Sequence, residues 1–160
     1  MEITKEALPM MLRDFFKTIP DSGITTISNV RRRSVIVDNI YNTVSPDEIL
    51  GIINSNPLLV TNSQLNVDNE LSDCDDYALQ LKALTTALYR QRMLSDETLF
   101  PPAVGIIITQ NHALNLVLTE SDDGIRLSVI DPSETNPAFL DDPLQCQQAL
   151  KVLPISLIYI

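Results

Sequence analysis

The spacing of apolar residues changes near the middle of the chain, and this change limits the possible folds more than any other feature. Residues 74–92 carry apolar side chains three and four positions apart, which is the spacing of a helix that packs on one face. Three runs rich in aliphatic residues follow, at 103–109, 112–119 and 125–131, and another covers 155–160. Their composition and alternation are typical of strands. The pattern therefore predicts an α+β fold, with a long helix packed on a small antiparallel sheet.

The first part of the chain contains weaker signals for secondary structure. Apolar residues at helical spacing predict a helix over 4–19, and the aliphatic run Ser34–Ile40 predicts a short strand. Ser45 precedes a proline and lies three residues before Glu48, which is the pattern of a capped helix start, so we expect a helix from 46 to about 53.

The length of 160 residues suits one domain. No internal repeat or linker-like stretch divides the chain. We therefore expect a single domain over 1–160, with a helical and loop-rich part at 1–70 and the long helix and sheet at 71–160.

The net charge of −10 argues against non-specific binding to nucleic acid or to anionic lipid. The one basic run, 31–33, is expected to be a solvated turn before a strand. The sequence contains no apolar run of roughly 18 residues that could span a bilayer, and its first residues lack the pattern of a signal peptide. We therefore expect a cytoplasmic protein without membrane or nucleic-acid partners.

Cys74 and Cys146 are the two cysteines, too few for a disulfide framework and without the spacing of a zinc site. Cys74 is predicted in the first turn of the long helix, where unpaired N–H groups and the helix dipole stabilise a thiolate. It is either a nucleophile or a small buried apolar residue. Cys146 falls in a candidate helix without an acid or base near it, and we expect it to take no part in chemistry.

The strands offer Cys74 a partner. Asp123-Gly124 predicts a tight turn between the last two strands of the 103–131 region. If Thr119 pairs with Gly124, His112 lies directly opposite Asp131 on one face of the hairpin. An aspartate beside a histidine orients the ring and stabilises its protonated form, so the pair predicts a Cys–His–Asp triad. The alternative is a histidine without chemistry at the edge of the core.

Four short motifs occur in order along the chain, and together they resemble a known family. They are Asp73-Cys74-Asp75-Asp76-Tyr77-Ala78-Leu79, Pro102-Ala103-Val104-Gly105-Ile106, His112-Ala113-Leu114-Asn115 and Ile130-Asp131-Pro132. They resemble the papain-like domain at the C-terminus of certain fungal agglutinins, which recurs in small bacterial and phage proteins. The first and third motifs are also similar to bacterial transglutaminase-like cysteine proteinases.

The resemblance covers roughly residues 70–134 and implies a papain-like fold. It implies Cys74 as nucleophile, His112 as base and Asp131 as the third member. The chain departs from the family in having Asn111 where glycine is usual before the histidine, and Asp131 where glutamate is usual. Glu134 is the alternative third member.

The resemblance also raises the question of cofactors and of the oxyanion hole. The agglutinins are linked to calcium, and Asp76 matches a position that could hold the ion. One or two carboxylates do not establish a calcium site, so we expect no required cofactor and name Asp76 as a candidate ligand. The backbone N–H of Cys74 would supply one oxyanion donor, and Gln64, Asn66 and Asn69 are equally available as the second.

The predicted function is that of a thiol-dependent acyl hydrolase or acyl transferase, similar to a cysteine peptidase or amidase, acting on a protein or peptide. The alternative is a non-catalytic papain-fold protein, such as a phage or bacterial accessory protein that binds a host protein. A third reading, an acidic mimic of nucleic acid, has only the net charge to support it. The sequence leaves the oligomeric state open.

Overall fold

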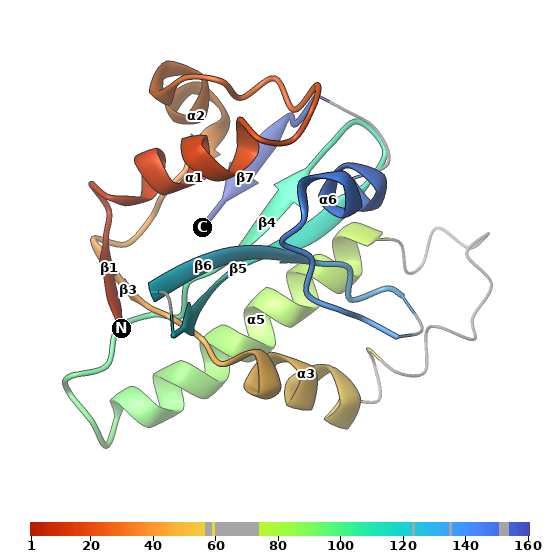
Figure 1. The fold of residues 1–160 in the computed structure, drawn as a ribbon. Helices are drawn as coiled ribbons and strands as arrows, with labels where there is room; N and C mark the ends of the chain where they lie inside the picture. Colours follow the sequence, from red (N-terminus) through yellow and green to blue (C-terminus); the bar gives the residue numbers. More distant parts are fainter. Residues whose placement is uncertain (57–58, 60–73, 123, 135, 151–153) are drawn as a thin grey trace.

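A five-stranded sheet runs through the centre of the molecule, with the strands in the order β2-β7-β4-β5-β6 (Figure 1). The strands are β2 Ser34–Val35, β4 Val104–Ile108, β5 Ala113–Ser121, β6 Gly124–Ile130 and β7 Leu157–Tyr159. All neighbouring pairs are antiparallel except β2 and β7, which are parallel. The computed structural model describes all residues other than 57–58, 60–73, 123, 135 and 151–153.

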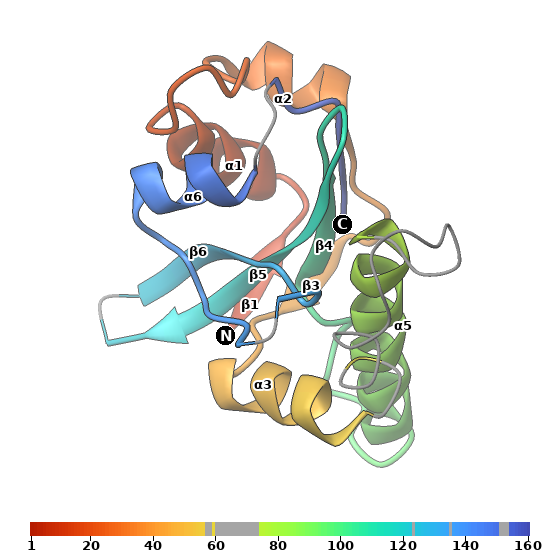
Figure 2. The same cartoon turned by 90° about the vertical axis from the view of Figure 1, so that its right-hand side faces the viewer.

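Helices cover both faces of this sheet. They are α1 Leu8–Phe16, α2 Ile27–Arg33, α3 Pro46–Ser55, α5 Cys74–Met93 and α6 Pro143–Ala149. Helices α3 and α5 lie on one face, and α1 and α6 lie on the other (Figure 2). The architecture is therefore α+β with a long helix packed on a mostly antiparallel sheet, as predicted.

The alternation of strand residues divides the core into two layers. Along β5, Leu114, Leu116 and Leu118 pack with the residues of α1 and α6. The intervening Val117 packs with α3 and α5 instead. Because successive side chains of a strand point to opposite faces, alternate residues of β5 contribute to the two layers of the core.

The predicted strand Ser34–Ile40 is wrong as a single element. Its first two residues form β2 in the main sheet, and Ile40 begins β3, Ile40–Asn42, which pairs with β1, Glu2–Thr4, in a separate two-stranded sheet. Between them the chain turns near Asp38, whose N–H donates to the Tyr41 hydroxyl at 2.7 Å. Asp38 and Asn39 are residues that favour turns. They separate β2 from β3, which were predicted to form one strand.

Two further local predictions are corrected. The basic residues at 31–33 form the last turn of α2, where the helix dipole favours cations, rather than a turn before a strand. Helix α3 begins at Pro46 as expected, but Ser45 makes no capping hydrogen bond. Glu48, the expected partner in the capping box, instead accepts a hydrogen bond from the Tyr89 hydroxyl and pairs with Arg92 on α5. Its contacts tie α3 to α5.

The N-terminal helix is also shorter than predicted. It occupies Leu8–Phe16, with Pro9 in its first turn, and a strand precedes it. In the described part of the chain, no helix combines the length and the apolar character needed to cross a bilayer.

Candidate active site

Cys74 is the first residue of α5, at the end of the helix where backbone N–H groups are unpaired within the helix. Cys74 is partly buried and packs against the apolar cluster formed by Ala78, Ile106 and Ala113. Its sulfur accepts a hydrogen bond from the backbone N–H of Ala113 at 3.2 Å. Ala113 directly follows His112, so the sulfur lies against the peptide that joins these two residues.

His112 and Asp131 form a hydrogen-bonded pair at the same end of the sheet. His112 Nε2 lies 2.7 Å from Asp131 Oδ2, and the two residues are only 7% and 6% exposed. The distance falls within the range expected of a histidine held by a carboxylate. Because Nε2 is engaged by Asp131, Nδ1 is the ring nitrogen left to act as a base.

The predicted hairpin register is wrong by two residues. Strand β5 continues to Ser121, which pairs with Gly124, and the last pair at the other end is Asn115 with Ile130. His112 and Asp131 therefore lie beyond the paired residues and meet diagonally rather than directly across. A shift of two keeps every side chain on its expected face, whereas a shift of one would have separated the pair.

Hydrogen bonds from His112 and Ser133 hold the Asp131 carboxylate. Besides His112, Ser133 donates its backbone N–H at 3.0 Å and its hydroxyl at 2.5 Å to Asp131 Oδ1. Burial by itself raises the pKa of Asp131, but the hydrogen bonds from His112 and Ser133 outweigh it, and the net pKa is lowered. The carboxylate is therefore ionised at neutral pH and can orient the imidazole.

Asn115 joins the long helix to the strands beside the pair. It is fully buried, and its Nδ2 donates to the carbonyl of Ala78 at 2.9 Å and to the carbonyl of Gly105 at 3.1 Å. Ala78 lies one helical turn after Cys74. The amide thus connects the start of α5 to β4 and β5.

Cys74 and His112 lie on different sides of the start of β5. Cys74 belongs to the face covered by α5, while the row that begins at His112 continues through leucines that face α1 and α6. His112 stands directly before β5, where the Thr109 N–H and hydroxyl both donate to its carbonyl and close the β4–β5 turn. The hydrogen bond from the Ala113 N–H places the Cys74 sulfur beside the same turn.

The other candidate residues lie outside this cluster. Cys146 is fully buried, and burial, together with the nearby charges of Asp141 and Asp142, raises the pKa of its thiol to about 12. Glu134, the alternative third member, is exposed. The carboxylate that is hydrogen-bonded to His112 belongs to Asp131. Gln64, Asn66 and Asn69, the candidate oxyanion donors, fall outside the described residues. Asp76 is half-buried, and among the described residues no three His, Cys, Asp or Glu side chains group as metal ligands.

Ser133 is the site residue that sequence reasoning missed. The signal was present, because an aspartate often accepts the N–H of the second residue after it in an Asx-turn. Asp131-Pro132-Ser133 has the required spacing, and the serine adds a hydroxyl donor.

Comparisons with known proteins identify structures of similar fold but assign the chain to no family. No protein-family model matches the chain, and no curated protein matches it in sequence. A solved structure described as a complex of PSL1a with E64 matches it with a TM-score of 0.65 and 14% identity, over 99% of this chain and 50% of that one. The Polyporus squamosus lectin bound to a human-type influenza-binding epitope, Neu5Aca2-6Galb1-4GlcNAc, matches with a TM-score of 0.60 and 14% identity, over 99% and 49%.

The chain thus spans about half the length of these lectin chains. At 14% identity, the similarity establishes a shared fold and leaves the chemistry of the site to the residues themselves.

Proposed function

We propose that the protein is a thiol-dependent acyl hydrolase or acyl transferase of the papain-like kind, with a protein or peptide as substrate. Cys74 is the nucleophile, His112 the general base, and Asp131 the residue that orients the histidine. The proposal depends on the buried His112–Asp131 pair, in which Nε2 and Oδ2 are 2.7 Å apart. Cys74, the first residue of α5, lies beside this pair, because its sulfur accepts a hydrogen bond from the N–H of Ala113, the residue after His112.

The chemistry follows from the proton positions. Asp131 accepts the Nε2 proton of His112, which leaves the lone pair on Nδ1 to take the proton of the Cys74 thiol. The thiolate attacks the acyl carbon, and the tetrahedral intermediate collapses when the imidazolium returns the proton to the leaving group. Water then releases the acyl group in a hydrolase, whereas a second amine takes it in a transferase.

The decisive experiment compares the reactivity of the two thiols. Iodoacetamide and E64, an epoxide that alkylates reactive thiols, are incubated with the protein across pH, and the modified cysteine is located by mass spectrometry. We expect Cys74 to react well below the usual thiol pKa of about 8.5, and Cys146 to stay unmodified because it is buried. Cys146→Ser is the matched control and should leave the reaction within a few-fold.

The His112→Ala variant tests the base. Removal of a general base typically lowers the rate by about 10²–10⁴-fold, so acyl-enzyme formation should be lost in this variant and reduced less in Asp131→Ala. A crystal structure should place the Cys74 sulfur within about 4 Å of His112 Nδ1, since proton transfer requires that reach. Ordinary thiol behaviour at Cys74, or a separation above about 8 Å with no moving segment, would favour the binding-protein alternative.

A further inference from the structure

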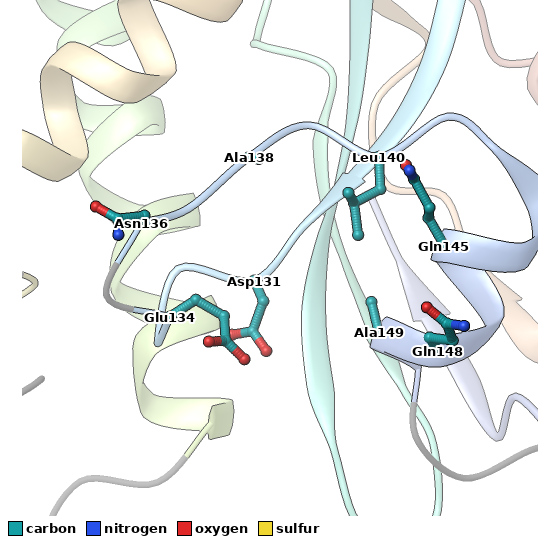
Figure 3. A pocket seen from close by; sticks show the side chains of 8 residues that line it. All are labelled: Asp131, Glu134, Asn136, Ala138, Leu140, Gln145, Gln148 and Ala149. Carbon is teal, nitrogen blue, oxygen red and sulfur yellow. The ribbon is translucent and has the colours of Figure 1, made fainter.

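A cavity of about 290 Å³ opens between the loop that follows β6 and helix α6 (Figure 3). Eight residues line it: Asp131, Glu134, Asn136, Ala138, Leu140, Gln145, Gln148 and Ala149. Asp131 is both a wall of this cavity and the partner of His112. A group bound in the cavity would therefore lie next to the His112–Asp131 pair.

The lining has the composition of a pocket for a long cationic side chain. Two of its residues are carboxylates, three are side-chain amides and three are apolar, and none is basic. Figure 3 shows the side chains of Asp131 and Glu134 pointing to the same side of the loop. Leu140 and Ala149 provide an apolar wall on the α6 side, along which an aliphatic stem could lie.

Glu134 is the charge that remains available for a ligand. Its side chain is exposed, and within the part of the chain that the structure describes it makes no ion pair. Asp131, in contrast, already accepts hydrogen bonds from His112 and Ser133. A cation in the cavity would therefore pair with Glu134, in a field made favourable by the net charge of −10.

We propose that this cavity is the subsite for a lysine or arginine side chain of the substrate, with Glu134 as its charged partner. This inference rests on the proposed function and adds the substrate class to it. The aliphatic stem lies against Leu140 and Ala149, and the ammonium or guanidinium group reaches the carboxylate of Glu134. The amides of Gln145 and Gln148 offer further oxygen acceptors to the same group.

The test is a set of peptides that differ at one residue, placed in turn on either side of the cleaved bond. The variable residue is lysine, arginine, glutamine, norleucine or glutamate. We expect kcat/KM to be highest for lysine or arginine at one position. In Glu134→Gln the ratio of kcat/KM for the basic peptide to kcat/KM for the glutamine peptide should fall about three- to tenfold. This is the effect expected from removing one charged hydrogen bond at a partly solvated site. Glu134→Lys should favour the glutamate peptide.

Glu97→Gln is the matched control, because it removes one exposed charge after the other end of α5 and should leave the ratio unchanged. An equal loss for all peptides in Glu134→Gln, or no preference for basic residues, would overturn the subsite. Thiol alkylation of the unmodified protein separates this failure from a failure of the proposed function.

If Cys74 does not turn over peptides, the Cys74→Ala variant and fluorescent lysine and norleucine peptides test the cavity by binding. Weaker binding of the lysine peptide to Glu134→Gln would then support the subsite alone, and equal affinities would reject it.

Discussion

Ser133 is one of two residues whose hydrogen bonds lower the pKa of the buried Asp131 carboxyl, and His112 is the other. The Ser133 Oγ and N–H both donate to Asp131, which helps to lower the pKa of that carboxyl against the effect of burial. In Ser133→Ala the pKa of Asp131 should rise, so the acid limb of the pH–rate profile should move to higher pH. The measurement is kcat/KM against pH. Ser133→Thr keeps the hydroxyl, and a shift as large in this variant would contradict the assignment.

Cys146 gives a second residue-level prediction, this time on stability in alkali. Its pKa is raised by burial from 9.0 to about 12, so the folded protein keeps the thiol proton after the unfolded chain has lost it. Stability should therefore fall with rising pH between about 9 and 12. Urea unfolding at pH 8 and pH 10.5 should show a smaller loss for Cys146→Ala than for the unchanged protein. Equal losses would mean that the thiol ionises freely in the fold.

Asn115 acts at the level of the elements, because one amide binds a helix carbonyl and a strand carbonyl. Asn115→Ala should cost about 1–3 kcal/mol of unfolding free energy, since buried carbonyls lose their donor. It should also slow the alkylation of Cys74, because the start of α5 is no longer held against β5. Thr85→Ala is the control, since the hydrogen bond that the structure describes for the Thr85 hydroxyl lies within α5, to the Leu81 carbonyl. It should lower stability without changing the alkylation rate.

Replacing two glycines by alanine should change the free energy of unfolding in opposite directions. A Cβ on Gly105 would lie 2.8 Å from the backbone oxygen of Tyr159, so Gly105→Ala should force β4 and β7 apart and cost about 1–3 kcal/mol. A Cβ on Gly51 meets nothing within 4 Å inside α3, and Gly51→Ala should add about 0.5–1 kcal/mol. Urea denaturation measures both, and the same sign for the two would contradict the close strand contact.

For the molecule as a whole, the sequence predicted what depends on local periodicity. Helix α5 and strands β4, β5 and β6 were found where spacing and alternation indicated them. The prediction that His112 and Asp131 point to the same face of the sheet was also correct, because a two-residue error in register leaves every side chain on its original face. The roles of these residues in catalysis stay a prediction.

Other features depend on contacts between distant parts of the chain, and no local pattern encodes them. The register was misjudged because Glu120 and Ser121 are polar and look like loop residues, although they continue β5. The division of Ser34–Ile40 between two sheets depends on partners far along the chain. The carbonyls that Asn115 binds lie 37 and 10 residues away, so its role became visible only in the fold.

The position of β7 in the sheet has a consequence for biosynthesis. Strand β4 pairs with β5 on one side and with β7 on the other, and β7 also carries β2. A ribosome delivers β4 about fifty residues before β7, so the isoleucine edge at 106–108 is unpaired while the intervening chain is made. A chain truncated after residue 154 should therefore expose that edge and aggregate, as light scattering would detect. We expect the same edge to pair between nascent chains on neighbouring ribosomes until residues 157–159 have been made.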